Sequence, residues 1–182
     1  MNTRNNAGRY GALSIALHWL MLLLIAAVYA CIELRGNFPK GSGMREGLKT
    51  WHFMLGLSVL VLVVIRAGAR FTSAVPAIQP VPPQWQSRLA SGMHFALYAL
   101  MVAMPVLGWL TLSAQGKVVP FFGLQLPQLV SESKSVAGWV KELHEAGGTI
   151  GYFLIGIHAA AALFHHHIVK DNTLRRMLPF RG

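Results

Sequence analysis

Apolar residues gather in four long runs along the chain, and polar residues gather between them. The runs cover about residues 13–32, 51–69, 93–113 and 149–168. Each is close to the roughly 20 residues that a helix needs to cross about 30 Å of hydrocarbon. The connections between the runs are short and leave no room for a separate soluble domain. The pattern predicts an all-α fold, a four-helix transmembrane bundle that forms one domain over residues 1–182.

Two connections are longer than the others. Residues 72–87 contain four prolines and are expected to form an extended loop on the inner side. Residues 115–143, on the outer side, contain several large apolar side chains. We expect them to form a short amphipathic piece that lies against the bundle or the membrane surface.

The composition agrees with a membrane location. The chain has 182 residues, of which 54% are hydrophobic and 12% are charged, about half the charged share of a soluble domain. The formal net charge is +10, but the basic residues lie between the runs and form no patch for nucleic acid. Nine lysines and arginines lie on the side of the two termini and seven on the other side. The positive-inside rule therefore predicts that both termini are cytoplasmic.

The first run has a second interpretation, a cleaved signal peptide, because residues 28–31 faintly resemble a lipoprotein cleavage site. The run is too long for a signal-peptide core, and it contains His18 and Trp19. These features favour a retained transmembrane helix.

Histidines lie inside the apolar runs, where an ionisable ring is costly and normally has a function. His144 and His158 are 14 residues apart, which on a helix is about 21 Å along one face. If both termini are inside, His52 and His144 lie in the outer half of the membrane and can form a pair. In the inner half, His158 can pair with either His18 or His94.

Paired imidazoles at two depths suit two six-coordinate haem irons. A zinc or copper site would normally gather three or four ligands at one depth. Imidazole on both axial sides leaves no open iron position, which favours electron transfer over oxygen binding. Gly56, Gly148 and Ala162 each follow a histidine by four residues and can leave room for a flat porphyrin. Ordinary close helix packing would also use such small residues.

Other polar residues near the inner ends of the runs are candidates for supporting roles. Arg66 and Arg70 can pair with haem propionates, although snorkelling to lipid headgroups explains them equally well. His165 lies seven residues beyond His158, about 10 Å further along the same face, where it can hydrogen-bond a quinone. His166 and His167 are interpreted as polar residues at the membrane interface.

Cys31 is the only cysteine. The chain therefore has no internal disulfide and no C-x-x-C-H motif for covalent haem attachment, so any haem is expected to be held non-covalently.

Several segments of the chain resemble the bacterial cytochrome b561 family, small dihaem membrane cytochromes characterised as superoxide oxidases. The similarity covers almost the whole chain and is closest in the fourth run and the tail. The segments are SIALHW at 14–19, ELRGNFP at 33–39, SVLVLVVIR at 58–66, HE at 144–145, GYFLIGIHAAAAL at 151–163, HH at 165–166 and KDNTLRRM at 170–177.

The resemblance implies two non-covalent b haems with the axial ligands His18, His52, His144 and His158. It also implies a ubiquinone site near His165 and leaves open whether His94 lies beside a haem or in the quinone pocket. The implied activity is oxidation of superoxide at the periplasmic side and reduction of ubiquinone near the cytoplasmic side. Two alternatives remain. One is a cytochrome b subunit that carries electrons between quinone and a partner dehydrogenase or hydrogenase. The other is a structural or transport membrane protein that uses its histidines as proton relays.

Overall fold

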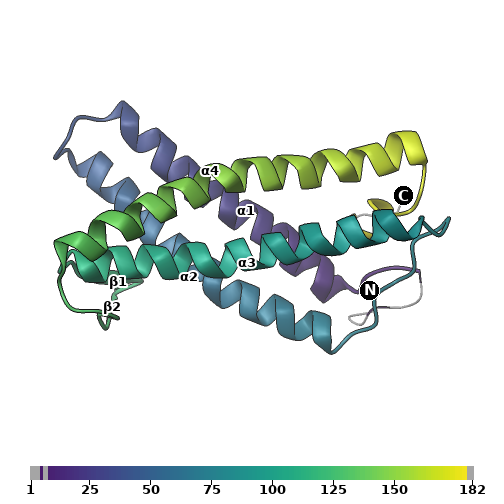
Figure 1. Cartoon of the computed structure of the whole chain (residues 1–182), viewed down its shortest axis with the longest axis horizontal. Helices are drawn as coiled ribbons and strands as arrows, with labels where there is room; N and C mark the ends of the chain where they lie inside the picture. Colours follow the sequence, from purple (N-terminus) through teal and green to yellow (C-terminus); the bar gives the residue numbers. More distant parts are fainter. Residues whose placement is uncertain (1–4, 6–7, 180–182) are drawn as a thin grey trace. The chain divides into compact units, whose positions relative to one another are not determined.

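A computed structural model describes residue 5 and residues 8–179 of the chain. Four long helices follow one another: α1 (Ala12–Leu34), α2 (Gly43–Phe71), α3 (Gln84–Ala114) and α4 (Lys134–Phe164), as Figure 1 shows. All four are long and apolar enough to cross a membrane. This confirms the all-α fold with four transmembrane helices. The side on which the termini lie, and the single domain, stay predictions.

Helices α2 and α4 begin at serine caps. The Ser42 hydroxyl accepts the N–H of Arg45 at 3.3 Å, and the Ser133 hydroxyl accepts the N–H of Val136 at 3.4 Å. Such caps satisfy backbone donors that the first helical turn leaves unpaired. Both helices therefore start well before their apolar runs, because capping and helix propensity extend them through polar residues that a hydropathy pattern excludes.

The connection after α3 differs from the amphipathic piece expected at residues 115–143. It forms an antiparallel hairpin of β1 (Val119–Phe121) and β2 (Leu124–Leu126), with Val119 opposite Leu126. The two turn residues, Phe122 and Gly123, have φ angles of 46° and 86°. Positive φ at both central residues is what a two-residue hairpin of matching twist requires. Residues 127–133 form no helix or strand, and residues 134–143 form the first turns of α4.

Three further short helical turns accompany the long helices. A 3₁₀ turn, η1 (Arg35–Asn37), follows α1, and a π-helical turn, η2 (His165–Val169), ends α4. A second 3₁₀ turn, η3 (Arg175–Met177), lies in the tail. Lys170 has a φ of 59° and stops the helix in the left-handed conformation usual at helix ends.

The chain divides into two compact units, and each long helix contributes residues to both. Unit 1 comprises Met1–Leu20, Val64–Ala99 and Ile150–Gly182, and unit 2 comprises Met21–Val63 and Leu100–Thr149. Unit 2 contains an apolar cluster in which α2, α3 and the hairpin pack together. Its members are Leu57, Leu112 and Val119, with Phe53, Trp109, Phe121 and Leu126 against them.

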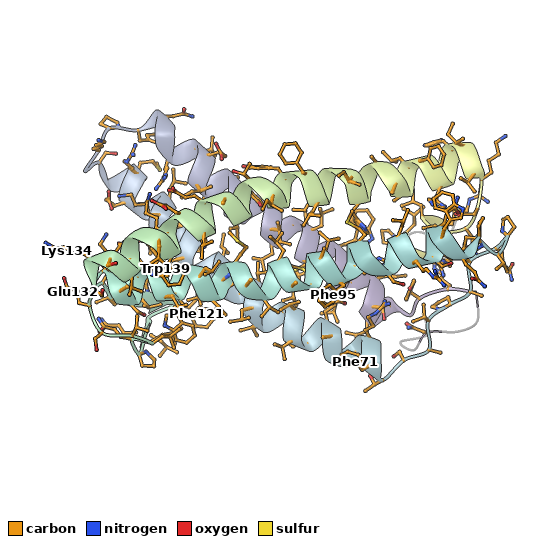
Figure 2. All side chains as sticks on the ribbon, viewed as in Figure 1. Phe71, Phe95, Phe121, Glu132, Lys134 and Trp139 are labelled. Carbon is orange, nitrogen blue, oxygen red and sulfur yellow. The ribbon has the colours of Figure 1, made fainter. Side chains whose placement is uncertain are left out.

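Unit 1 is held together by hydrogen bonds from side chains to the backbone. The N-terminal start of α1 and the C-terminal tail lie at the same end of this unit (Figure 1). There the indole N–H of Trp19 donates to the Met177 carbonyl at 2.8 Å. Large apolar side chains remain on its surface: Phe71 and Phe95, labelled in Figure 2, are 88% and 76% exposed. Such exposure suits side chains that face lipid.

Candidate functional site

Unit 2 brings together the two histidines that the sequence pairs in the outer half. His52 on α2 and His144 on α4 are half-buried, and their ring centroids are 6.1 Å apart with an angle of 79° between the planes. Two imidazoles on opposite sides of one metal should have centroids separated by about 6.4 Å. This distance between centroids is the sum of a metal–nitrogen bond of about 2 Å on each side and a distance of about 1.2 Å from each nitrogen to the centre of its ring. The observed separation is therefore suitable for axial ligands of one iron.

The backbone orients the His52 ring. Its Nδ1 atom lies 3.0 Å from the Val28 carbonyl oxygen, so Nδ1 carries the hydrogen and donates it to that oxygen. This tautomer leaves the Nε2 lone pair available for a metal, an arrangement usual for ligating histidines. Nδ1 of His144 is buried near the Met104 carbonyl, without a hydrogen bond of ordinary geometry.

Two of the small residues that the sequence singles out, Gly56 and Gly148, have open space beside them. A Cβ atom added at Gly56 would meet nothing within 4 Å, and one added at Gly148 would meet only the Met104 methyl, at 3.9 Å. Gly108 on α3 was not singled out from the sequence. A Cβ there would lie 3.3 Å from Cε1 of His144. Because Gly108 has no side chain, the His144 ring can occupy this position beside α3 without a steric clash.

Unit 1 places His158 between both of its candidate partners. The ring centroids of His18 and His158 are 6.4 Å apart, and those of His94 and His158 are 5.6 Å apart. The first distance equals the separation of about 6.4 Å expected for opposite axial ligands, and the second is shorter. His18 and His158 are half-buried, whereas His94 is exposed. Both observations favour His18 over His94 as the partner of His158.

Arg66 also lies in unit 1, and its Nη1 atom is buried without a hydrogen-bond partner among the described residues. A buried unpaired cation is costly, so such an atom indicates an anionic partner. A small cavity of about 30 Å³ adjoins it, lined in part by Tyr10, Arg70 and Tyr98. Since one water needs about 10–15 Å³ by this measure, the cavity suits a carboxylate and is too small for a whole cofactor. Arg66 thus fits a haem propionate, while the exposed Arg70 also fits snorkelling to headgroups.

His165 lies in η2, and a carboxylate that the sequence reasoning missed holds its ring. Nδ1 of His165 is 2.6 Å from Oδ2 of Asp171, whose side chain is 1% exposed. Burial acts to raise the pKa of the Asp171 carboxyl. Hydrogen bonds from His165 and Thr173 outweigh that effect and keep the pKa below its usual value. One signal was available in the sequence: Asp171 is the sole acidic residue on the predicted inner side.

The other histidines of the triplet have no such partner. The His166 and His167 rings stack edge to face at 4.7 Å, and His167 is exposed. No group of three or more His, Cys, Asp or Glu side chains suited to a metal ion gathers within residues 5 and 8–179. The side chains that do converge are the paired histidines.

Apolar helices that bring histidines together in pairs at haem-ligand separation are typical of membrane-bound b-type cytochromes. The chain matches the family model described as prokaryotic cytochrome b561 over residues 9–180. It belongs to that family.

Three relatives have similar lengths. Cytochrome b561 homolog 1 of Escherichia coli (strain K12) is 43% identical over 173 residues, which are 95% of this chain and 98% of the relative. The probable superoxide oxidase CybB of Yersinia pestis is 37% identical over 171 residues, 94% of this chain and 96% of the relative. Cytochrome b562 of Cereibacter sphaeroides is 30% identical over 178 residues, 93% of this chain and 94% of the relative.

Family membership and the four apolar helices define the general role. The chain is a multi-pass electron-transfer protein of the bacterial inner membrane, and its family uses b-type haem.

Proposed function

We propose that the chain holds two non-covalent b-type haems, one between His52 and His144 and one between His18 and His158. The ring separations of 6.1 and 6.4 Å carry this proposal. Held by these histidines, the haems would supply one-electron transfer. The chain's own residues supply the ligand atoms, the Val28 carbonyl that orients His52, and the Arg66 guanidinium as partner for a propionate. His94 lies beside His158 but is not proposed as a haem ligand.

The proposed reaction oxidises superoxide at the periplasmic side and reduces ubiquinone near the cytoplasmic side. Two superoxide anions lose one electron each and leave as two oxygen molecules. One ubiquinone takes up the two electrons and two protons to become ubiquinol. The name of the Yersinia pestis relative, a probable superoxide oxidase, supports this choice of substrate.

Basic residues on the predicted outer side can steer an anion towards the His52–His144 pair. They are Arg35, Lys40, Arg45, Lys49, Lys117, Lys134 and Lys141. Acidic residues offset some of them: Lys49 pairs with Glu46 at 2.7 Å and Lys141 with Glu145 at 2.8 Å. The remaining excess is modest, so we expect salt to slow superoxide oxidation only slightly.

His165 is proposed to bind the ubiquinone. An imidazole can hydrogen-bond a quinone carbonyl and pass a proton to it, which provides general-acid assistance. In unit 1, His165 follows His158 on the same chain segment, at the end of α4. The pair with Asp171 leaves its Nε2 atom available for this contact.

The purified chain alone tests this proposal. Mixed with superoxide and a soluble ubiquinone analogue, it should form oxygen and ubiquinol in a ratio of two to one. His165→Ala should keep both haem spectra and rapid haem reduction by superoxide, while electron delivery to the quinone falls sharply. His167→Ala, at the same helix end, is the matched control and should behave as the wild type. Activity that appears only with an added dehydrogenase or hydrogenase would favour a carrier subunit instead.

A further inference from the structure

The end of α4 folds back so that a carboxylate meets the last histidine on the helix's ligand-bearing face. After η2, the left-handed Lys170 reverses the chain, and the Asp171 N–H donates to the His165 carbonyl at 3.2 Å. The same reversal brings Oδ2 of Asp171 to 2.6 Å from Nδ1 of His165. A π-helical turn is rare and is found frequently at functional sites. Here the π-helical turn η2 includes His165 and directly precedes Lys170 and Asp171, so it lies where the chain turns back to form the His165–Asp171 contact.

Both oxygens of the Asp171 carboxylate are engaged. Oδ1 accepts the backbone N–H of Thr173 at 2.8 Å, while Oδ2 meets the imidazole. The side chain is 1% exposed, whereas that of His165 is 21% exposed. The carboxylate is therefore buried behind a ring that is still accessible. A buried ionised carboxylate needs such partners, because desolvation without them is costly.

The tail that carries Asp171 is itself tied to the connection between α2 and α3, within unit 1. Asn172 accepts the Gln79 N–H on its side-chain oxygen at 2.9 Å, and its own N–H donates to the Gln79 carbonyl at 3.1 Å. The buried Arg176 donates to the Pro76 carbonyl. These bonds fix the position of the carboxylate, so Asp171 is held against His165.

We infer that Asp171 is a positioning residue for proton delivery by His165, an inference that rests on the proposed quinone role of His165. The carboxylate accepts the Nδ1 hydrogen and so directs Nε2 away from the tail. When the ring is protonated, the Nε2–H bond breaks and its proton goes to the reduced quinone oxygen. The imidazole is then neutral and still donates its Nδ1–H to the Asp171 carboxylate. Water at the interface returns a proton to Nε2. The carboxylate stabilises the charged ring, as buried carboxylates do beside catalytic imidazoles.

The decisive variant is Asp171→Asn, which keeps the size and a hydrogen-bond acceptor but removes the negative charge. We expect it to keep both haems and normal reduction by superoxide. Haem reoxidation by a soluble ubiquinone analogue should slow at least about tenfold, with the quinone KM unchanged because Asp171 does not touch the quinone. Asp171→Glu should restore part of the rate. Arg175→Gln is the matched control, since it changes one exposed charge in the same tail and keeps the carboxylate and its hydrogen bonds, and it should reoxidise at the wild-type rate.

A double variant separates the possible outcomes. If Asp171 acts through His165, His165→Gln with Asp171→Asn should be no slower than His165→Gln alone. Wild-type reoxidation in Asp171→Asn, with a slow His165→Gln, would overturn the inference and leave the quinone role of His165 intact. A slow Arg175→Gln would overturn it as well, because a general effect of changing the charge of the tail would then explain the loss. Wild-type rates in His165→Gln would remove the quinone role and the inference together. If Asp171→Asn loses haem, Asp171→Ser, which also removes the negative charge, provides the comparison and should slow reoxidation in the same way.

Discussion

At the scale of single residues, each paired histidine has its own setting. His52 is oriented by the Val28 carbonyl, and His144 depends on the absence of a side chain at Gly108. His158 is near two imidazoles, of which only His18 has the separation expected for an axial partner. Being a histidine therefore does not by itself make a residue a haem ligand, because His94 is also a histidine and is not proposed as one.

Pairs of histidine substitutions test the ligand assignment. His144→Ala and His18→Ala should each lower the haem content from two per chain to one, because a haem with one axial imidazole is held weakly. The double variant His18→Ala with His144→Ala should hold none, whereas His18→Ala with His158→Ala should still hold one. The pyridine haemochrome assay measures these contents. His94→Ala is the control and should keep two haems. A haem that survives in the first double variant would disprove the pairing.

Acid should weaken the contact between the His165 ring and the Asp171 carboxylate at the end of α4. The pKa of Asp171 lies below its usual value in the folded chain, so its contribution to stability is present above the unfolded pKa of about 3.9. That contribution is lost as the pH falls through the lower, folded pKa. At pH 7, Asp171→Asn should therefore melt below the wild type, and the difference in Tm should shrink below about pH 4. Thermal melts monitored by circular dichroism measure it. A difference that stays constant with pH would contradict this assignment.

At the scale of elements, the sequence predicts the helices better than it predicts what joins them. The first three apolar runs lie within α1, α2 and α3, and the fourth lies within α4 and η2, because burial in hydrocarbon favours helices at these positions. The hairpin from Val119 to Leu126 was missed, because its turn at Phe122 and Gly123 carries no strong hairpin dipeptide. The outer pair, His52 with His144, could be foreseen from depth alone, whereas depth left His158 with two candidate partners, His18 and His94. The contact of His165 with Asp171 could not be foreseen, because it depends on a π turn and a left-handed Lys170 that no periodicity shows.

A substitution on α3 tests how closely the helices of unit 2 approach the His52–His144 pair. Gly108→Val places a branched side chain where a Cβ already lies 3.3 Å from the His144 ring. Overpacking of this kind costs about 1–3 kcal/mol, and the displaced ring should lose its haem. Haem content should fall towards one per chain. Gly92→Val on the same helix is the control, because a Cβ there meets nothing within 4 Å. Equal haem contents in the two variants would show that the contact is unimportant.

At the scale of the whole molecule, the chain has no covalent means of holding its cofactor. Cys31 is its only cysteine, so noncovalent packing and the proposed histidine ligands would retain the two proposed haems. Acid–acetone extraction of the purified protein should therefore remove all haem, and the untreated protein should hold two haems per chain. Absorption spectra of the extracted protein and of the organic phase provide the measurement. Haem that remains with the protein would contradict the prediction, as would a content of one haem per chain.

Helix α4 supplies one member of each histidine pair, His144 in unit 2 and His158 in unit 1. A ribosome makes this helix last. Through most of synthesis the growing chain therefore contains His18 and His52 without their partners, and neither pair can close around iron. Under the proposed ligation, haem capture would follow insertion of the fourth helix into the bilayer. The order of residues along the chain would then make haem loading a late step of biogenesis, and a chain truncated before Lys134 would lack one histidine of each pair.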